Sequence, residues 1–168
     1  MAARDILKYF NVFVDGRGYA GECEEFNPPK LALKMEDFRS GAMTNPIEIE
    51  LGEEKLESDF SLISYSRQII ALYGLHRGAN IAVTMRGSME STDGVLTPIV
   101  HNMRGIIKEV DSGTSKAGDK PALKISLAVR YYKLSHGGSV VQERDPENFV
   151  YVVDGVDMMA QHRKNLGI

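Results

Sequence analysis

Residues 113–120, with the sequence GTSKAGDK, come nearest to a catalytic motif because their glycine spacing resembles that of a phosphate-binding loop. Such a loop needs a lysine straight after its second glycine, followed by a helix whose N-terminus binds the phosphate. Here Asp119 follows the second glycine, and Pro121 interrupts the start of the helix. The segment is therefore interpreted as a hairpin loop made of turn residues.

Nucleophiles and metal ligands are sparse and scattered. The four histidines are His76, His101, His136 and His162, and none has a cysteine or carboxylate at metal-ligand spacing. They are interpreted as surface or turn residues. Cys23 is the only cysteine and has no neighbouring base, so it is interpreted as a small packing residue. A single cysteine also excludes an intramolecular disulfide and indicates a reducing compartment.

Paired carboxylates also fail to form an acid–base site. The adjacent pairs are Glu24-Glu25, Glu36-Asp37 and Glu53-Glu54. Neighbours on a strand point to opposite faces, so the members of each pair do not converge on a substrate. No GxSxG or HExxH pattern occurs. The sequence therefore predicts no catalytic, cofactor-binding or metal site, and the chain is interpreted as not an enzyme.

Length and charge limit the remaining possibilities. A chain of 168 residues, 43% hydrophobic and 26% charged, is predicted to form a single domain over residues 1–168. A net charge of −3 excludes a generally basic nucleic-acid binder. Residues 22–59 hold eleven acidic and four basic side chains, a net −7, which leaves +4 for the rest. This imbalance suits head-to-tail assembly, and it suits a solvated acidic face equally well. No signal peptide or membrane-spanning run is recognised, so membrane insertion is not expected.

Alternating apolar and polar residues predict strands along most of the chain. Expected strands cover residues 6–14, 18–21, 31–36, 47–51, 55–62, 81–90, 96–110, 120–134 and 140–151, with a bend at Gly105 and a break at Pro146. In the clearest strand, one face is expected to hold Leu123, Ile125, Leu127, Val129 and Tyr131, and the other Lys124, Ser126, Ala128, Arg130 and Tyr132. Clean alternation favours antiparallel sheets with one buried face.

Two short helices complete the predicted elements. Residues 64–74 are expected to form a helix capped by Ser66 and ended by Gly74 or Gly78, with Ile69, Ile70 and Tyr73 clustered on one face. A second helix is expected at residues 157–167, with basic residues near its C-terminus. The fold class is therefore mainly β with a flanking helix, as an antiparallel β-sandwich or barrel.

The loop at residues 37–46 interrupts two strands that each have one apolar face. It is too long for a tight turn, and it carries two large apolar side chains, Phe38 and Met43. Such a loop either packs on its own domain or reaches into a neighbour. We take the second reading and expect an intersubunit contact at Phe38, Arg39, Gly41, Ala42 and Met43. The alternative is that Phe38 and Met43 fill the core of their own subunit.

Five stretches in order along the chain carry a family resemblance. They are NVFVDGRGYAG at residues 11–21, PKLALKMEDFRSGAM at 29–43, MRGIIKEVDSGTSKAGDK at 103–120, KISLAVRYYKL at 124–134, and VDGVDMMAQHRKNLGI at 153–168. With them the chain resembles the FII-type major tail tube proteins of contractile-tailed phages, which are similar to the tube proteins of R-type pyocins. The resemblance implies the phage tail tube type of β-sandwich or barrel, with a long intersubunit loop.

The resemblance also implies an assembly. Six copies would close into a ring, and rings would stack into a hollow tube in the virion tail, assembled in the cytoplasm of the bacterial host. Implied partners are further copies of this chain and the tail sheath, tape measure, baseplate and tail terminator proteins. Phage DNA would pass through the lumen without specific binding, whereas pyocin tubes puncture membranes. Joining sheet edges around a ring would remove exposed edges by closure.

A tube that conducts DNA places a demand on its inner wall. DNA carries one charge per ~1.7 Å of axis, so clustered basic side chains along a tube would retain it. The acidic strand faces meet this demand best, and at least two of Glu48, Glu50, Glu57 and Asp59 are expected to face the lumen. The face with Lys124, Arg130 and Tyr132 meets it worst and is expected to contact the sheath or a neighbouring subunit.

Two alternatives remain at this point. One is a tube protein of the related type VI secretion machinery, whose rings carry effectors rather than DNA. The other is a monomeric β-barrel module that binds nucleic acid or carbohydrate, which would need a basic groove with stacking aromatic residues. The chain offers only Arg130, Tyr132 and Lys133 for such a groove, with Tyr131 on the opposite face.

Overall fold

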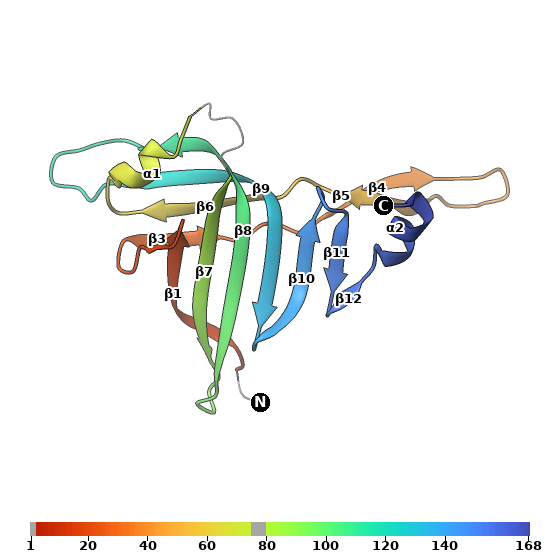
Figure 1. Cartoon of the computed structure of the whole chain (residues 1–168), viewed down its shortest axis with the longest axis horizontal. Helices are drawn as coiled ribbons and strands as arrows, with labels where there is room; N and C mark the ends of the chain where they lie inside the picture. The colour runs from red at the N-terminus through yellow and green to blue at the C-terminus, as the bar shows by residue number, and fades with distance from the viewer. Residues whose placement is uncertain (1–2, 75–79) are drawn as a thin grey trace.

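One large antiparallel sheet dominates the computed structural model, which describes residues 3–74 and 80–168 (Figure 1). Its strands run in the order β12-β11-β10-β9-β8-β7-β1-β2. In addition, β6 pairs with β9, and β3 pairs with β6. Its strands are β1 (Ile6–Val14), β2 (Arg17–Gly18), β3 (Cys23–Asn27), β6 (Glu57–Leu62), β7 (Ile81–Glu90), β8 (Leu96–Asp111), β9 (Leu123–His136), β10 (Ser139–Asp145), β11 (Val150–Val153) and β12 (Val156–Asp157). The expected antiparallel pairing is confirmed.

The sheet folds over itself because its two longest strands bend together. Gly105 in β8 lies so close to β9 that an added Cβ would be 2.1 Å from the carbonyl oxygen of Ala128, so only glycine fits. The first half of β9 pairs with β6, and its second half pairs with β10. Figure 1 shows β3, β6 and the start of β9 crossing over β1, β7 and β8. The predicted bend at Gly105 is confirmed as a register shift.

The core lies between these two layers. Phe60, Leu123 and Ile125 are fully buried in one layer, and Val12 and Val83 are buried opposite them in the other. Each comes from a strand whose apolar residues alternate with polar ones, so burial follows the period of two. The expected face of the first half of β9, with Leu123, Ile125 and Leu127, is therefore confirmed, and β6 shows the same alternation of burial.

The expected faces of β9 are wrong beyond Val129. Gly105 pairs with Val129, whereas Arg104 pairs with Tyr131, so Arg130 is an extra residue in β9. A bulge of one residue reverses the side of every later side chain. Tyr132 is consequently buried and does not share an outer face with Lys124.

The first hairpin forms, but the return strand expected at residues 18–21 is wrong beyond Gly18, because residues 19–21 belong to no strand. β1 and β2 pair antiparallel across Asp15 and Gly16, which have φ values of 47° and 81°. Two consecutive positive φ values are typical of the type I′ turn, whose twist matches that of paired strands. The expected break at Pro146 is also confirmed, because β10 ends before it and β11 begins after it.

The two helices are short. They are α1 (Arg67–Ala71) and α2 (Ala160–Leu166). Ser66 precedes α1 without capping it, because its hydroxyl hydrogen-bonds with the Tyr19 hydroxyl and donates to the side-chain amide oxygen of Gln68 instead. Ile69 alone is buried, while Ile70 and Tyr73 are exposed, so the expected three-residue face is wrong. Gly78, an expected helix end, lies outside the described residues. The C-terminal helix is confirmed, with Arg163 and Lys164 in its last turn and Gly167 at its end.

The strands expected at residues 31–36 and 47–51 form, but they are not half-buried. They are β4 (Leu33–Phe38) and β5 (Ile47–Glu53), which make a separate two-stranded sheet. We call residues 33–53 the arm. Figure 1 shows the arm extending away from the two layers of the body. Its apolar side chains therefore lie outside the core.

Candidate functional site

The candidate chemical motifs do not form a catalytic site. Residues 113–120 form part of the loop between β8 and β9, where the Asp111 carboxylate accepts a hydrogen bond from the Gly113 amide at 2.8 Å. This is a turn stabilised by its own side chain, and no helix follows it. The interpretation as a hairpin loop is confirmed.

The histidines and the cysteine lie apart. His136 is near Asp5, with 3.8 Å between Nε2 and Oδ2, and His162 is exposed on α2. His101 is buried, so its interpretation as a surface residue is wrong, and His76 lies outside the described residues. Burial raises the pKa of the Cys23 thiol to about 11, which keeps it in the unreactive protonated form. Within residues 3–74 and 80–168, no three metal-binding side chains gather, and no helix is long and apolar enough to span a membrane.

The arm is the most unusual surface of the molecule. Large apolar side chains that are between about a third and a half exposed occur along its whole length: Leu33, Met35, Phe38, Ile47, Ile49 and Leu51. None of them belongs to the core cluster. So many exposed large apolar side chains on one element are typical of a protein–protein contact.

The strand register divides the arm into two faces. Phe38 lies opposite Ile47, and Glu36 lies opposite Ile49, so these four side chains share one face. On the other face, Asp37 lies opposite Glu48, and Met35 lies opposite Glu50. We call the first the apolar face and the second the acidic face. The sequence alone did not predict these two faces, because they depend on which residues of β4 and β5 lie opposite each other.

The expected contact residues lie at the tip of the arm, but only Phe38 belongs to a strand. The Arg39 Nε donates a hydrogen bond to the Met43 carbonyl at 3.2 Å, and the Met43 amide donates to the Ser40 carbonyl at 3.1 Å. These bonds close the tip on itself. Gly41 and Ala42 are exposed, and Met43 is half-buried. Within the chain, the tip does not pack against the core cluster.

The four carboxylates expected at the lumen lie on two different elements. Glu48 and Glu50 are on the arm, whereas Glu57 and Asp59 are on the outer side of β6. Hydrogen bonds from Lys108 and then Lys55 lower the pKa of Glu57.

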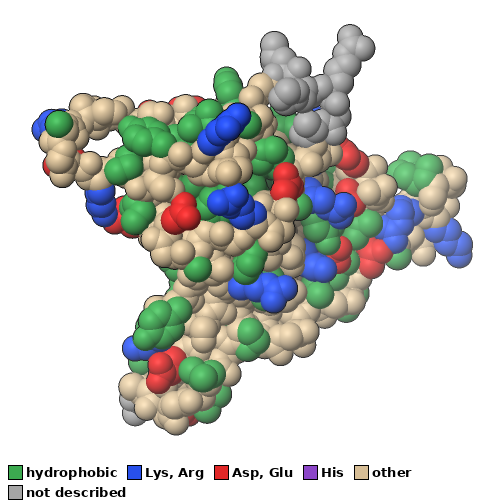
Figure 2. Space-filling model, turned by 60° about the vertical axis from the view of Figure 1, so that its left-hand side comes forward, with side chains coloured by type: hydrophobic (Ala, Val, Ile, Leu, Met, Phe, Trp, Pro, Cys, Tyr) green, Lys and Arg blue, Asp and Glu red, His purple; other side chains and the backbone are tan. Residues whose placement is uncertain are grey.

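Asp59 is also close to basic groups. It accepts a hydrogen bond from Asn27 at 2.7 Å and has Lys124 3.7 Å away. We expected Asp59 on an acidic face and Lys124 on a separate basic face. In the body the two side chains are neighbours, so this separation is wrong there. Figure 2 likewise shows acidic and basic side chains interspersed over one side of the molecule.

A second exposed apolar surface lies at the far end of the body. Ile6 pairs with Glu90, and Glu90 pairs with Leu96, which brings the start of β1 beside the start of β8. Ile6, Leu7, Tyr9, Val95 and Leu96 are all exposed there. The alternation of apolar and polar residues predicted these strands correctly. It did not show that this end of the strands extends beyond the core.

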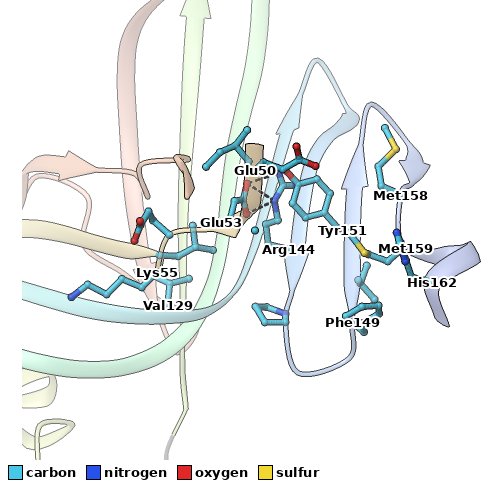
Figure 3. A pocket seen from close by; sticks show the side chains of 16 residues that line it. Glu50, Glu53, Lys55, Val129, Arg144, Phe149, Tyr151, Met158, Met159 and His162 are labelled. Atoms are coloured by element: carbon cyan, nitrogen blue, oxygen red, sulfur yellow. Dashed lines mark hydrogen bonds and ion pairs between the residues drawn. The ribbon is translucent and has the colours of Figure 1, made fainter. Parts of the chain in front are cut away.

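Arg144 is a functional candidate that sequence reasoning missed. It is 4% exposed, and its Nε donates to both carboxylate oxygens of Glu53 at 3.0 and 2.8 Å (Figure 3). The Tyr151 hydroxyl donates to the same carboxylate at 3.1 Å. Beside this group is a cavity of about 860 Å³, lined by residues of the arm base, β11 and the α2 region. In sequence, Arg144 resembles any other charged residue of a strand.

Comparison with known proteins identifies the family. The profile described as phage tail tube protein FII matches residues 4–167. The tail tube protein of Escherichia phage P2 is 33% identical over 172 residues, which cover 100% of both chains. The major tail tube protein of Serratia phage KSP20 is 30% identical over 94% of this chain and 92% of that one.

Solved structures with the same fold come from an extracellular contractile injection system called PVC. Its sheath/tube terminator has a TM-score of 0.58 at 13% identity, covering 75% of this chain and 92% of that one. Its sheath–tube complex also gives 0.58, at 12% identity and 75% and 87% coverage. The expected mainly β fold is thus confirmed, and the sequence matches show that the chain belongs to the FII family of phage tail tube proteins, structural components of the virion tail and not enzymes.

Proposed function

We propose that this tail tube subunit assembles into hexameric rings, and that the rings stack into a hollow conduit for phage DNA. The observation that carries this proposal is the arm, which presents large apolar side chains outside the body of its own subunit. Exposed apolar side chains gathered on one element mark a protein–protein contact. A second copy of the same chain can be the partner in this contact. When the same contact repeats from copy to copy, the copies build a tube.

The arm tip is the proposed contact between subunits. Phe38, Arg39, Gly41, Ala42 and Met43 lie where the arm is farthest from its own body. The apolar face, with Phe38, Ile47 and Ile49, would be buried against the neighbour. The competing reading, in which Phe38 and Met43 fill the core of their own subunit, is not supported, because neither belongs to the core cluster.

The edges of the large sheet are the proposed contacts around the ring. The described sheet has edges at β2 and β12, which have two residues each, and at β3, which pairs with β6. β2 pairs only with the last two residues of β1, so the earlier part of β1 leaves a sheet edge with unpaired backbone groups that another strand could join. In a closed ring, the edge of one copy would meet the edge of the next, which removes free edges altogether.

The acidic face of the arm is the proposed lumen-facing surface. At least two of Glu48, Glu50, Glu57 and Asp59 would line the channel. Glu57 and Asp59 are partly neutralised by lysines, whereas Glu48 and Glu50 have no ion pair among the described residues. The second pair therefore fits best, since it leaves the apolar face of the same arm free to contact a neighbour.

The further partners follow from the family and from the fold. The PVC structures of the same fold include a sheath–tube complex. We infer that the assembled tube lies inside a tail sheath, that it encloses the tape measure protein, and that it joins the baseplate and the tail terminator. Assembly would take place in the cytoplasm of the bacterial host.

Electron microscopy of purified protein tests this function. The wild-type chain should form rings or tubes, and F38S/M43S should yield a folded monomer by circular dichroism and size-exclusion chromatography. The matched control is F38L/M43L, which keeps apolar side chains and should still assemble. Normal tubes from the serine variant, or a disordered arm tip in an assembled tube, would contradict the proposed contact.

A further inference from the structure

Arg144 is held rigidly in the body. Its Nη1 donates to the backbone carbonyls of Glu143 and Val152, both at 3.0 Å, and its Nη2 donates to the Gln142 side chain at 2.6 Å. The Tyr151 ring stacks on the guanidinium, with 3.5 Å from Cζ to the ring centroid. Backbone acceptors on β10 and β11 therefore fix both the position and the plane of the guanidinium.

The arm is joined to this rigid group through one side chain. Glu53, the last residue of β5, accepts both Arg144 bonds and the bond from Tyr151. The other hydrogen bonds of described arm side chains, from Arg39 to Met43 and from Ser40 to Met43, stay within the tip. Glu53 is therefore the point at which side-chain hydrogen bonds connect the described part of the arm to the body.

An open cavity adjoins the base of the arm. The cavity of about 860 Å³ lies against Leu33 and Glu53 on the arm side and against Phe149 and Met159 on the body side. Figure 3 shows Arg144, Glu53 and Tyr151 at the wall of this cavity, with their bonds drawn between them. Close packing is therefore incomplete on this side of the arm base, where the hydrogen bonds of Glu53 connect it to the body.

We propose that Arg144 is the positioning residue of the arm: by holding Glu53 in a fixed plane, it sets the direction in which the arm leaves the body. A buried ion pair contributes little net stability, because desolvation offsets the attraction, and a directional role is one reason to retain it. The Nε of Arg144 donates to both carboxylate oxygens while its Nη atoms bind the body, a directional arrangement that an apolar contact does not provide.

The length of the arm makes its direction important for assembly, because a small rotation at its base moves the tip by a larger distance. Six to seven residues at ~3.3 Å each place the tip roughly 20 Å from Glu53. A swing of ~10° at Glu53 would then move the tip by ~3–4 Å, which is about the separation of packed atoms. Arms of identical direction reach identical sites on neighbouring subunits, as a symmetric tube requires. The part of the inference that concerns assembly rests on the proposed function.

The test separates direction from stability with E53L/R144M. Replacing both charged partners by apolar residues avoids an unpaired buried charge, so the variant should fold with a similar melting temperature. Spin labels on S40C and S88C, in a C23S background, report the distance from arm tip to body in unassembled subunits. We expect the distance distribution to widen at least twofold and the lag before tube formation to lengthen at least tenfold. R144K, which keeps the charge but not the fork, should lie between wild type and the double variant.

The matched control is R163M. Arg163 also joins separate elements, through Asp157 and the Phe149 carbonyl, but it makes no hydrogen bond to the described residues of the arm, and its loss should leave the arm distances unchanged. An unchanged distribution in E53L/R144M would overturn the positioning role, whether or not tubes form. A wide distribution with normal tube formation would overturn its role in assembly. Failure of the proposed function itself would appear separately, as normal tubes from F38S/M43S.

Discussion

His101 and Tyr132 form a buried polar pair inside the β-sandwich. The His101 Nδ1 lies 3.0 Å from the Tyr132 hydroxyl, and the Phe26 ring is 5.8 Å from the imidazole between centroids. Burial lowers the pKa of His101, because the charged imidazolium loses its hydration there. The same burial raises the pKa of Tyr132 to about 12. The pair is thus stable in its neutral form.

This pair predicts a loss of folding stability in mild acid. The unfolded chain binds a proton at His101 below about pH 6.5, whereas the folded chain resists it, so the free energy of unfolding falls as pH drops below 6.5. The slope approaches at most about 1.4 kcal/mol per pH unit until the folded pKa is reached. Urea unfolding of the unassembled subunit at pH 7.5, 6.5 and 5.5 measures this effect.

H101Q is the control for this prediction. Glutamine can still bond to Tyr132 but does not titrate, so the variant should be less stable at pH 7.5 and should lose less stability between pH 6.5 and 5.5. The carboxylates with lowered pKa, Glu57 and Asp157, lose their contribution only below about pH 4.5, where unfolded carboxylates become protonated. Equal acid slopes for H101Q and wild type would refute the assignment.

At the scale of the element, the arm lacks what usually stabilises a hairpin. A lone pair of strands is only marginally stable in water, and like charges directly opposite each other weaken it further. Asp37 lies opposite Glu48, and neither has an ion pair among the described residues. The arm therefore belongs to the least stable part of the molecule until a partner covers it.

Hydrogen exchange should reveal this dependence on assembly. Amides of β4 and β5 in the unassembled subunit should exchange at least tenfold faster than those of β7 to β9, and they should become protected in tubes. D37N removes the opposed charges and should slow exchange of the arm in the free subunit, with little change in the body. Arm amides that are already as protected as the body in the monomer would contradict this view.

At the scale of the whole molecule, the charge of the channel wall should control the passage of DNA. E48K/E50K places basic groups where we propose the lumen, so phage tubes should assemble but eject DNA more slowly. The delay should be larger at low salt, where phosphate–lysine attraction is less screened. Ejection kinetics of phage carrying the variant, measured at two ionic strengths, test this prediction.

E48Q/E50Q is the matched control, because it removes the negative charges at the same positions without adding positive ones. Its ejection rate should lie between those of wild type and E48K/E50K. An assembled tube in which Glu48, Glu50, Glu57 and Asp59 all lie on the outer wall would reject the lumen assignment. A channel wall dominated by lysine and arginine would reject it equally.

Local patterns determined most of the secondary structure and the family. Alternation with a period of two identified the strands and the buried face of the first half of β9, because burial on one side of a sheet imposes that period. Gly105 marked the bend, where an added Cβ would collide with β9. Motifs spread from residue 11 to residue 168 were enough to indicate the tail tube family, which the family match confirms.

Tertiary structure alone decided which faces meet. A single extra residue, Arg130, turned Tyr132 into the core, and the register of β4 with β5 separated an apolar face from an acidic one. The same apolar alternation gave a buried strand in β6 and an exposed one in β4, because local sequence does not say whether another layer lies above a strand. The pairing of Glu53 with Arg144 joins residues 91 positions apart, a distance at which no local rule connects one side chain to another.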